Sequence, residues 1–467
     1  MSLQVLAALL RKYFWYCRIY GVKSATRLAI RRLKKRNVPP KLVALAPVEL
    51  RIPCVEENLP LIDKKISAII PTRNGGKEFP LLLRKLKTQK GIRECEMILV
   101  DSGSSDDTIL FGKREGATIV EIPPETFNHG LSRNMGAEYA TGDFLLFTVQ
   151  DALPMTEQWL WEMANVLVRN DVVAVSCAEF PRSDCDLFYR LLMWSQYRHL
   201  HLDRDRFLAW DESCASDHGL RANSGISDLA ALIKREVFRK YKYHNGFAED
   251  LELGKRLIKD GHRIGFLYST RVLHSHNRPA YFFLKRGYVD ARFRNELFPG
   301  SYIAIDSDLA LIRDIAAMYQ RTNCVARTIS SLKSPQSVGS LIDRIRALYI
   351  QEPENLRVEE GTPEDTRLDE FVRSLISRGK IQAPQYDART NMILPHLLAH
   401  VAELETYLSG TYASVDAEVM REVASALRKM LALHAGNHMG YWYATALASG
   451  HHDIGLAGLD KMLQDGI

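Results

Sequence analysis

Short apolar runs, each closed by a polar loop, are the feature that most constrains how this chain can fold. Their content of Ile, Val and Phe predicts β-strands. They lie at residues 65–71, 96–101, 117–122 and 143–149. Between the first two runs, Leu81, Leu82 and Leu86 have the spacing of the buried face of a helix. This alternation predicts an α/β fold with a mostly parallel sheet and helices on both faces.

The loops after the first two strands are the first candidates for a binding site, because ligands of such sheets bind at the carboxyl ends of the strands. The first loop contains Pro71, Thr72, Arg73 and Asn74, and the second begins with Asp101 and Ser102. Small residues in both loops would let a ligand approach the backbone, and Asp101 can accept hydrogen bonds from a ribose or a base. Each loop by itself is also typical of an ordinary turn.

Two charged residues lie on either side of the fourth strand. Arg133 precedes it and can offer a planar guanidinium to a diphosphate. Asp151 follows it and can hold a divalent cation that bridges the same phosphates. A helix-surface arginine and a turn aspartate are the alternative interpretations.

An acidic pair, Glu249 and Asp250, begins a predicted helix. Asp250 shares a helical face with Leu253 and Leu257, so it is expected on the inward side. The helix dipole favours the ionised form of a carboxylate in the first turn. The alternative is a simple helix cap.

Two histidine pairs stand out further along the chain. His274 and His276 end an apparent strand, and the two-residue period of a strand places both on one side. Imidazoles placed in this way can complete the coordination shell of a metal that Asp151 holds. The second pair, His199 and His201, is interpreted as belonging to the surface or to an acceptor site.

The order of these segments resembles the family 2 glycosyltransferases of the GT-A fold, especially their bacterial rhamnosyltransferase-like branch. The matching motifs are IIPTRN, VDSGSSDDT, RNMGAEYATGD and an acidic motif after the next strand, within about residues 63–295. Two positions depart from the usual pattern. Ser102 replaces the second aspartate of V-D-D, and Gln150-Asp151-Ala152 replaces D-x-D, similar to the T-Q-D-A type of motif in the rhamnosyltransferase-like branch.

The resemblance implies an inverting glycosyltransferase with Asp250 as catalytic base and Glu249 as second choice. It implies that Asp151, with His274 and His276, binds Mg²⁺ or Mn²⁺. The residues expected to bind the nucleotide-sugar are Pro71, Thr72, Arg73, Asn74, Asp101, Ser102, Arg133, Asn134 and Gln150. Trp210 and Asp211 are expected on the acceptor side from their position in the chain. The favoured donor is dTDP-rhamnose, ahead of UDP- and GDP-sugars, and the expected acceptor is a bacterial polysaccharide or a lipid-linked glycan.

The chain is predicted to have three regions. They are a basic amphipathic N-terminal segment at 1–60, a GT-A domain at 61–295 and a helical C-terminal domain at 296–467. Residues 1–41 hold eleven Lys and Arg and no acidic residue, whereas the rest carries 51 basic and 56 acidic residues. This segment is predicted to lie on the inner face of the cytoplasmic membrane. Packing on the protein itself and RNA binding are its alternatives.

Other features narrow the location and the class of protein. No apolar run is long enough for a transmembrane helix, and the seven cysteines have no paired spacing, so we expect a cytoplasmic protein. No GxGxxG follows a predicted strand, which disfavours a dinucleotide oxidoreductase, and no motif that reads bases indicates a nucleic-acid partner. A non-catalytic scaffold with a degenerate transferase domain is the alternative function, and the oligomeric state is left open.

Overall fold

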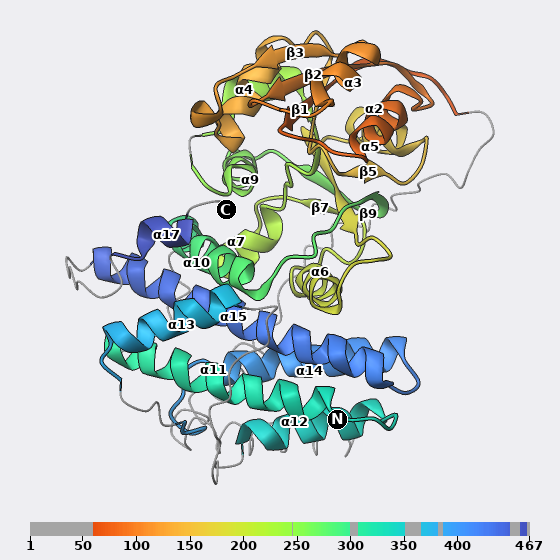
Figure 1. The fold of residues 1–467 in the computed structure, drawn as a ribbon. Helices are drawn as coiled ribbons and strands as arrows, with labels where there is room; N and C mark the ends of the chain where they lie inside the picture. The colour runs from red at the N-terminus through yellow and green to blue at the C-terminus, as the bar shows by residue number, and fades with distance from the viewer. Residues whose placement is uncertain are drawn as a thin grey trace. The chain divides into compact units, whose positions relative to one another are not determined.

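The computed structural model describes residues 59–244, 246–298, 307–350, 366–381, 386–448 and 458–464 (Figure 1). Contacts within the chain divide it into two compact units. What we call the sheet unit contains the described residues from 59 to 298 and those from 418 onwards. The helical unit contains the described residues from 307 to 417. Each unit buries apolar residues of its own.

Parallel strands form the first half of the sheet, in the order β3-β2-β1-β4. These strands are β1 (Ile62–Thr72), β2 (Ile92–Asp101), β3 (Thr118–Glu121) and β4 (Phe144–Thr148). Each overlaps one of the apolar runs from which a strand was predicted. All five residues of β4 are buried, as expected for a central strand covered on both faces.

Helices α2 (Phe79–Lys87), α3 (Thr108–Arg114) and α4 (His129–Glu138) connect these strands, with a short 3₁₀ turn, η1 (Pro124–Thr126), before α4. The buried face of α2 differs from the predicted one. Its buried residues are Phe79, Leu82, Leu83 and Leu86, whereas Leu81 is 38% exposed. The face follows the i, i+3, i+4, i+7 pattern that starts at Phe79, and this pattern includes Leu83 and excludes Leu81.

The second half of the sheet mixes parallel and antiparallel strands. It is built from β8 (Ala230–Lys234), β6 (Ala174–Phe180), β9 (Ile264–Leu273), β5 (Leu153–Pro154) and β7 (Arg206–Leu208). β8 lies antiparallel between β4 and β6, β6 pairs in parallel with β9, and β5 and β7 are antiparallel to β9. The predicted fold class, a GT-A sheet with a helical C-terminal region, is confirmed, and its parallel character is strongest in the first half.

The remaining elements of the sheet unit are α5 (Trp159–Arg169), α6 (Leu187–His199), η2 (Glu212–Ala215), α7 (Asp217–Asn223), α8 (Arg235–Tyr241), α9 (Glu249–Lys259), α10 (Ala280–Leu297), α15 (Ala417–Ala448) and α17 (Asp460–Gln464). α15 lies so close to α10 that a Cβ on Gly436 would be 2.0 Å from the carbonyl oxygen of Leu284. Asp460 of α17 accepts hydrogen bonds of 2.6 Å from Tyr288 and Arg292 of α10. These contacts attach the C-terminal helices to α10.

The helical unit contains α11 (Asp308–Ser330), α12 (Val338–Ile350), α13 (Thr366–Arg378) and α14 (Leu394–Thr411). An ion pair of 2.6 Å between Arg346 and Glu405 joins α12 to α14. Gln336 and Val415 form an isolated antiparallel bridge, and the described residues beyond 298 contain no longer strand. This region is therefore helical, as predicted.

Several predictions fall on residues outside the described ranges. The basic N-terminal segment, residues 1–60, and its membrane contact lie almost wholly before residue 59. The domain boundaries at 60 and 295 stay predictions. Within the described ranges, none of the helices has the length and apolar character needed to cross a bilayer. The cysteines there, at positions 95, 177, 185, 214 and 324, are free thiols.

Candidate active site

The carboxylate of Asp101 is already surrounded by donors from the protein. Asp101 ends β2 and is buried; its Oδ1 accepts a hydrogen bond of 3.1 Å from the hydroxyl of Thr72. Its Oδ2 accepts bonds of 3.0 and 2.8 Å from the N–H groups of Gly103 and Ser104. Ser102 is also buried, and its N–H and hydroxyl both donate to the Thr72 carbonyl. In this structure both side chains therefore fix the shape of the two loops.

Gln150 joins the loop after β1 to the loop after β4. Its Oε1 accepts a hydrogen bond of 2.9 Å from the N–H of Arg73, and its Nε2 donates to the Arg73 carbonyl at 3.2 Å. Asn74, which has a φ of 49°, accepts a hydrogen bond of 2.8 Å from the N–H of Ser105. Pro71 lies at the end of β1, just before these residues. The loops after β1, β2 and β4 are thus held together, and the side chain of Arg73 is left exposed.

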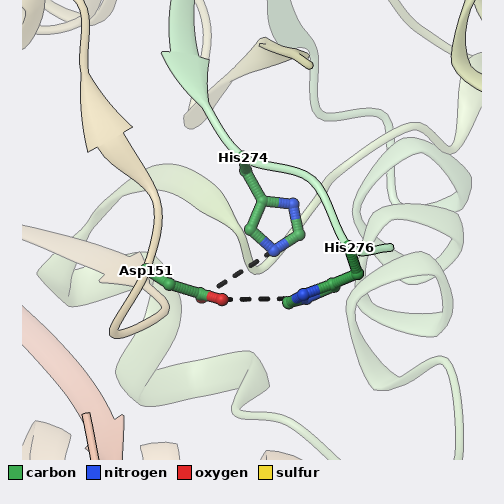
Figure 2. A group of neighbouring side chains, drawn as sticks. All are labelled: Asp151, His274 and His276. Carbon is green, nitrogen blue, oxygen red and sulfur yellow. Dashed lines mark ion pairs between the residues drawn. The ribbon is translucent and has the colours of Figure 1, made fainter. Parts of the chain in front are cut away.

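Asp151, His274 and His276 converge as predicted, and Figure 2 shows their side chains pointing toward one another. Asp151 lies in the loop after β4, and the histidines follow β9 directly. The Nε2 atoms of His274 and His276 lie 3.8 and 3.7 Å from the Asp151 carboxylate oxygens. These separations are too long for hydrogen bonds. Two atoms that each bind one ion at about 2.1 Å can be up to about 4.2 Å apart, so the donor set fits a cation.

Glu179 of β6 orients one of these imidazoles. Its Oε2 lies 2.7 Å from Nδ1 of His274, which leaves Nε2 directed at Asp151. Burial works against the charged imidazole, but the hydrogen bond and charge of Glu179 outweigh it and raise the pKa of His274. Burial and the neighbouring His274 lower the pKa of His276. A carboxylate behind a histidine in this way is the usual second partner of a metal-binding imidazole.

An open pocket of about 360 Å³ adjoins the group at His276. It is lined by Glu78, Arg182, Asp184, Ser275, His276, Asn277 and Arg278. Arg182 is held in place by an ion pair with Glu78 and by a hydrogen bond of 2.7 Å to the carbonyl of Asp151. The pocket therefore places two arginines beside the group of potential metal ligands.

Arg133 faces carboxylates of the protein. Its side chain is 1% exposed, and its guanidinium forms an ion pair with Asp228 and another of 3.3 Å with Glu249. It also donates a hydrogen bond of 2.9 Å to the His129 carbonyl. The imidazole of His129 lies within 4.8 Å of both carboxylates, so these three residues could hold a metal. Arg133 already supplies the positive charge there.

The acidic pair that begins α9 lies in this second group, which we call the acid cluster: Arg133, Asp228, Glu249 and Asp250. Asp250 is half-buried, and its oxygens accept hydrogen bonds of 2.7 and 3.2 Å from the N–H groups of Leu251 and Asp228. Burial and the charge of Asp228 raise the pKa of Asp250 to about 6. Burial and the charges of Asp228 and Asp250 raise the pKa of Glu249 to about 8, although Arg133 opposes the shift.

The acid cluster and the group of potential metal ligands lie at the same end of β4. Thr148, the last residue of β4, is paired with Ala230, the first residue of β8. Its hydroxyl donates a hydrogen bond of 2.9 Å to the Leu229 carbonyl. Asp151 follows Thr148 by three residues, and Asp228 precedes Ala230 by two. A single strand pairing therefore anchors both groups.

The other predicted site residues lie elsewhere or have structural partners. Asn134 exchanges hydrogen bonds of 2.8 and 2.9 Å with the backbone of Tyr243. Asp211 caps η2 by accepting a hydrogen bond of 2.8 Å from the N–H of Ser213. Trp210 is 50% exposed. The acceptor role predicted for Trp210 and Asp211 stays a prediction.

Sequence reasoning missed Asp228 and Glu179. Asp228 lies just before β8, a strand whose sequence AALIK carries little β-branched character. Glu179 is near the end of β6, where a single acidic residue in an apolar run could have been noticed. Glu179 acts on His274 from the strand next to β9, so its importance depends on sheet order. Asp228 acts on Arg133 of α4 and Asp250 of α9, so its importance depends on how these helices pack.

Comparison with known proteins gives a family match for part of the chain. The family described as Glycosyl transferase family 2 matches residues 67–223. The O-antigen chain rhamnosyltransferase RfbN of Salmonella typhimurium is 27% identical over 223 residues, which are 46% of this chain and 67% of that protein. The O-antigen chain rhamnosyltransferase WbaN of Salmonella anatum is 28% identical over 222 residues, which are 45% of this chain and 65% of that protein.

Among solved structures, the mannosyltransferase PcManGT from Pyrobaculum calidifontis, in complex with GDP-Man and Mn²⁺, is similar with a TM-score of 0.42. It is 15% identical, and the similarity covers 83% of this chain and 91% of that chain. The family match includes Asp151 and Arg133 but ends before Asp228, Glu249, Asp250 and the histidines.

Proposed function

The chain belongs to family 2 of the glycosyltransferases, and we propose that it transfers rhamnose from dTDP-rhamnose to a bacterial polysaccharide or lipid-linked glycan. Its relatives RfbN and WbaN are named as O-antigen chain rhamnosyltransferases, and they support this choice of sugar. The matched segments span about two thirds of those proteins, so donor and acceptor are proposals for this chain.

One observation carries the proposed reaction: the pairing of Thr148 with Ala230 anchors the group of potential metal ligands and the acid cluster at the same end of β4. Sugar transfer from a nucleotide-sugar needs positive charge at the leaving group and a base for the acceptor hydroxyl. The departing diphosphate develops negative charge, and the incoming hydroxyl loses a proton. The two groups offer these functions from the same edge of the sheet.

Asp151, His274 and His276 would hold the divalent cation, Mg²⁺ or Mn²⁺. When bound, the cation supplies positive charge next to the leaving diphosphate. Glu179 keeps the Nε2 of His274 directed at the site through its contact with Nδ1. Arg182 and Arg278 line the adjoining pocket together with Glu78 and Asp184, and their guanidinium groups would bind phosphate oxygens.

Asp250 is the general base in this proposal. The acceptor oxygen bonds to the anomeric carbon on the face opposite the diphosphate, and the bond from that carbon to the diphosphate oxygen breaks. The diphosphate leaves with the electron pair of that bond, and the hydroxyl proton moves to a carboxylate oxygen of Asp250. A base whose pKa is about 6 is mostly ionised at pH 7 and still accepts a proton readily.

The contacts of Arg133 favour a positioning role over the diphosphate-binding role expected from the sequence. Its guanidinium joins Asp228 to Glu249, and Asp228 in turn donates its N–H to Asp250. This chain of contacts fixes where the Asp250 carboxylate lies. Arg133 would therefore act on the reaction through the base.

Nucleotide binding to designed variants tests the proposal. We expect dTDP with Mg²⁺ or Mn²⁺ to raise the thermal midpoint of the wild-type chain more than UDP or GDP does, because a ligand of the folded state stabilises it. Asp151→Asn should lose this metal-dependent shift, and Asp250→Asn should keep it and yet release no dTDP from dTDP-rhamnose in the presence of acceptor. The proposal fails if no nucleotide stabilises the chain or if Asp151→Asn behaves as the wild type.

A further inference from the structure

Three imidazoles that have no role in the proposed reaction meet on the surface of the sheet unit. His199 is the last residue of α6, His201 follows two residues later, and His218 lies in the first turn of α7. All three are exposed. We propose that His199, His201 and His218 form a second metal site, of the class that binds Zn²⁺ through imidazole nitrogen.

The separations of the rings support this site. The ring centroids of His199 and His218 are 4.6 Å apart, and those of His201 and His218 are 6.3 Å apart. A zinc ion bound at about 2.0–2.1 Å by ring nitrogens lies about 3.2 Å from each centroid, which places tetrahedral ligands about 5 Å apart. The two observed separations lie on either side of this value. The three rings do not bring their nitrogens within 4.8 Å of one another, so binding of one ion requires these exposed side chains to rotate.

The backbone at His201 is a second, independent observation. The N–H of Leu202 donates to the Tyr197 carbonyl at 2.7 Å, and the N–H of His201 donates to the Arg198 carbonyl at 3.2 Å. This is the Schellman motif that ends a helix, and its left-handed position usually holds glycine. His201 occupies that position with a φ of 56°. A side chain that is disfavoured by its own backbone is a sign of a function for that side chain.

The chemistry of the three histidines also suits a metal. No ion pair with a carboxylate is found for any of them among the described residues, so their rings are not held as partners of acids. Imidazole ligands favour Zn²⁺ over the oxygen-loving Mg²⁺ and Mn²⁺. This site offers three imidazoles, whereas the group at Asp151 offers two imidazoles and a carboxylate.

Two measurements on the full-length chain, first freed of metal with a chelator, test this site. Calorimetry measures the binding of Zn²⁺ as ZnCl₂ is added, and diethylpyrocarbonate then modifies the accessible histidines with and without Zn²⁺. We expect Zn²⁺ to protect His199, His201 and His218 from modification, as mapped by mass spectrometry of peptides. His201→Gly and His218→Ala should each weaken zinc binding at this site at least tenfold. His276→Ala is the matched control, since it removes one imidazole of the other group and should leave the protection of these three intact.

His201→Gly also separates lost binding from lost folding. Glycine suits a φ of 56°, so the metal-free variant should melt at or above the wild-type temperature although it binds less zinc. The proposal is overturned if both variants bind zinc like the wild type, or if the only zinc lost is that lost in His276→Ala. Neither outcome depends on sugar transfer, so this site and the proposed function can fail separately.

Discussion

The two groups at the end of β4 manage charge in opposite ways. Asp151 faces two imidazoles, and within the described residues its carboxylate contacts no lysine or arginine. The acid cluster has its own cation, because Arg133 is buried between Asp228 and Glu249. The first group therefore offers donor atoms that could hold a cation, whereas the second already contains one.

The acid cluster instead has too many carboxylates for its arginine. Asp228, Glu249 and Asp250 lie at close range around Arg133, and Glu249 is buried. The positive charges of Arg221 and Arg286 also act on Asp250. Burial and the mutual repulsion of these carboxylates favour their protonated forms, which is why the pKa values of Glu249 and Asp250 are raised. Under the proposed function the two groups therefore have different roles: the first would bind a metal, and the second would accept a proton.

Asp250→Asn should have the largest effect, because it removes the proton acceptor and leaves the metal ligands untouched. We expect turnover to fall by about 10²–10⁴-fold, the usual contribution of a general base. Release of dTDP from dTDP-rhamnose in the presence of a glycan acceptor measures it. Glu252→Gln is the control, since Glu252 lies in the same helical turn and forms an ion pair of 2.8 Å with Arg256.

A result in which Asp250→Asn keeps full turnover would place the base elsewhere, with Glu249 as the next candidate. If substitutions of Asp250, Glu249 and Asp151 all leave the glycan product unchanged, neither group takes part in catalysis. The scaffold interpretation would then be favoured.

Arg133→Met should have the next largest effect, which is a loss of folding stability, because the variant leaves Asp228 and Glu249 without their cation. Breaking one side of a buried ion pair costs about 3–5 kcal/mol. We expect a loss of this order at pH 8 and a smaller loss at pH 5, where the acids can be protonated. Urea denaturation followed by tryptophan fluorescence reports it through Trp159 and Trp161, which are buried in the sheet unit.

The double variant Arg133→Met/Glu249→Gln provides the control for that experiment. It removes a carboxylate together with the arginine, so it should recover part of the lost stability. If the double variant is no more stable than Arg133→Met, the arginine stabilises the fold by packing and the charge balance described above is wrong.

Glu179→Gln should act on the metal-binding group and weaken divalent-cation binding by about 10–100-fold, the usual effect of losing the carboxylate behind a metal-binding histidine. An amide no longer fixes the tautomer of His274. Calorimetric titration with Mn²⁺ measures the loss, with the exposed carboxylate of β3 in Glu121→Gln as the control. Equal Mn²⁺ affinity in Glu179→Gln and the wild type would contradict the assignment of His274 as a ligand.

Much of the first half of the fold could be predicted because its signals are local. An apolar run closed by a polar loop defines β1 or β4 without reference to the rest of the chain. The approach of Asp151 to His274 and His276 was predictable for a similar reason, since strand ends and a two-residue alternation already place them on one edge. The turn around Asp101 was predictable too, because its N–H donors, Gly103 and Ser104, follow within three residues.

The partners of Arg133 could not be predicted in this way. Glu249 lies 116 residues further along the chain, and it meets Arg133 only because α9 packs on α4. Sequence spacing says nothing about such a contact, so an arginine after a turn was interpreted as a phosphate ligand. Asp228 was missed because its partners, Arg133 and Asp250, lie far from it in the sequence and no local motif marks it.

The dependence of turnover on pH should show the smallest effect and the sharpest difference between the groups. A base must be deprotonated to act, and the pKa of Asp250 is raised from its ordinary value of 3.8 to about 6, so turnover should fall as the pH drops below about 6. Asp228→Asn keeps the N–H that donates to Asp250 but removes a neighbouring negative charge. The midpoint of the pH profile should therefore move to lower pH in that variant. Asp151→Asn should lower turnover at every pH and leave the midpoint of the profile in place. A midpoint that shifts in Asp151→Asn and does not shift in Asp228→Asn would reverse the roles given to the two groups.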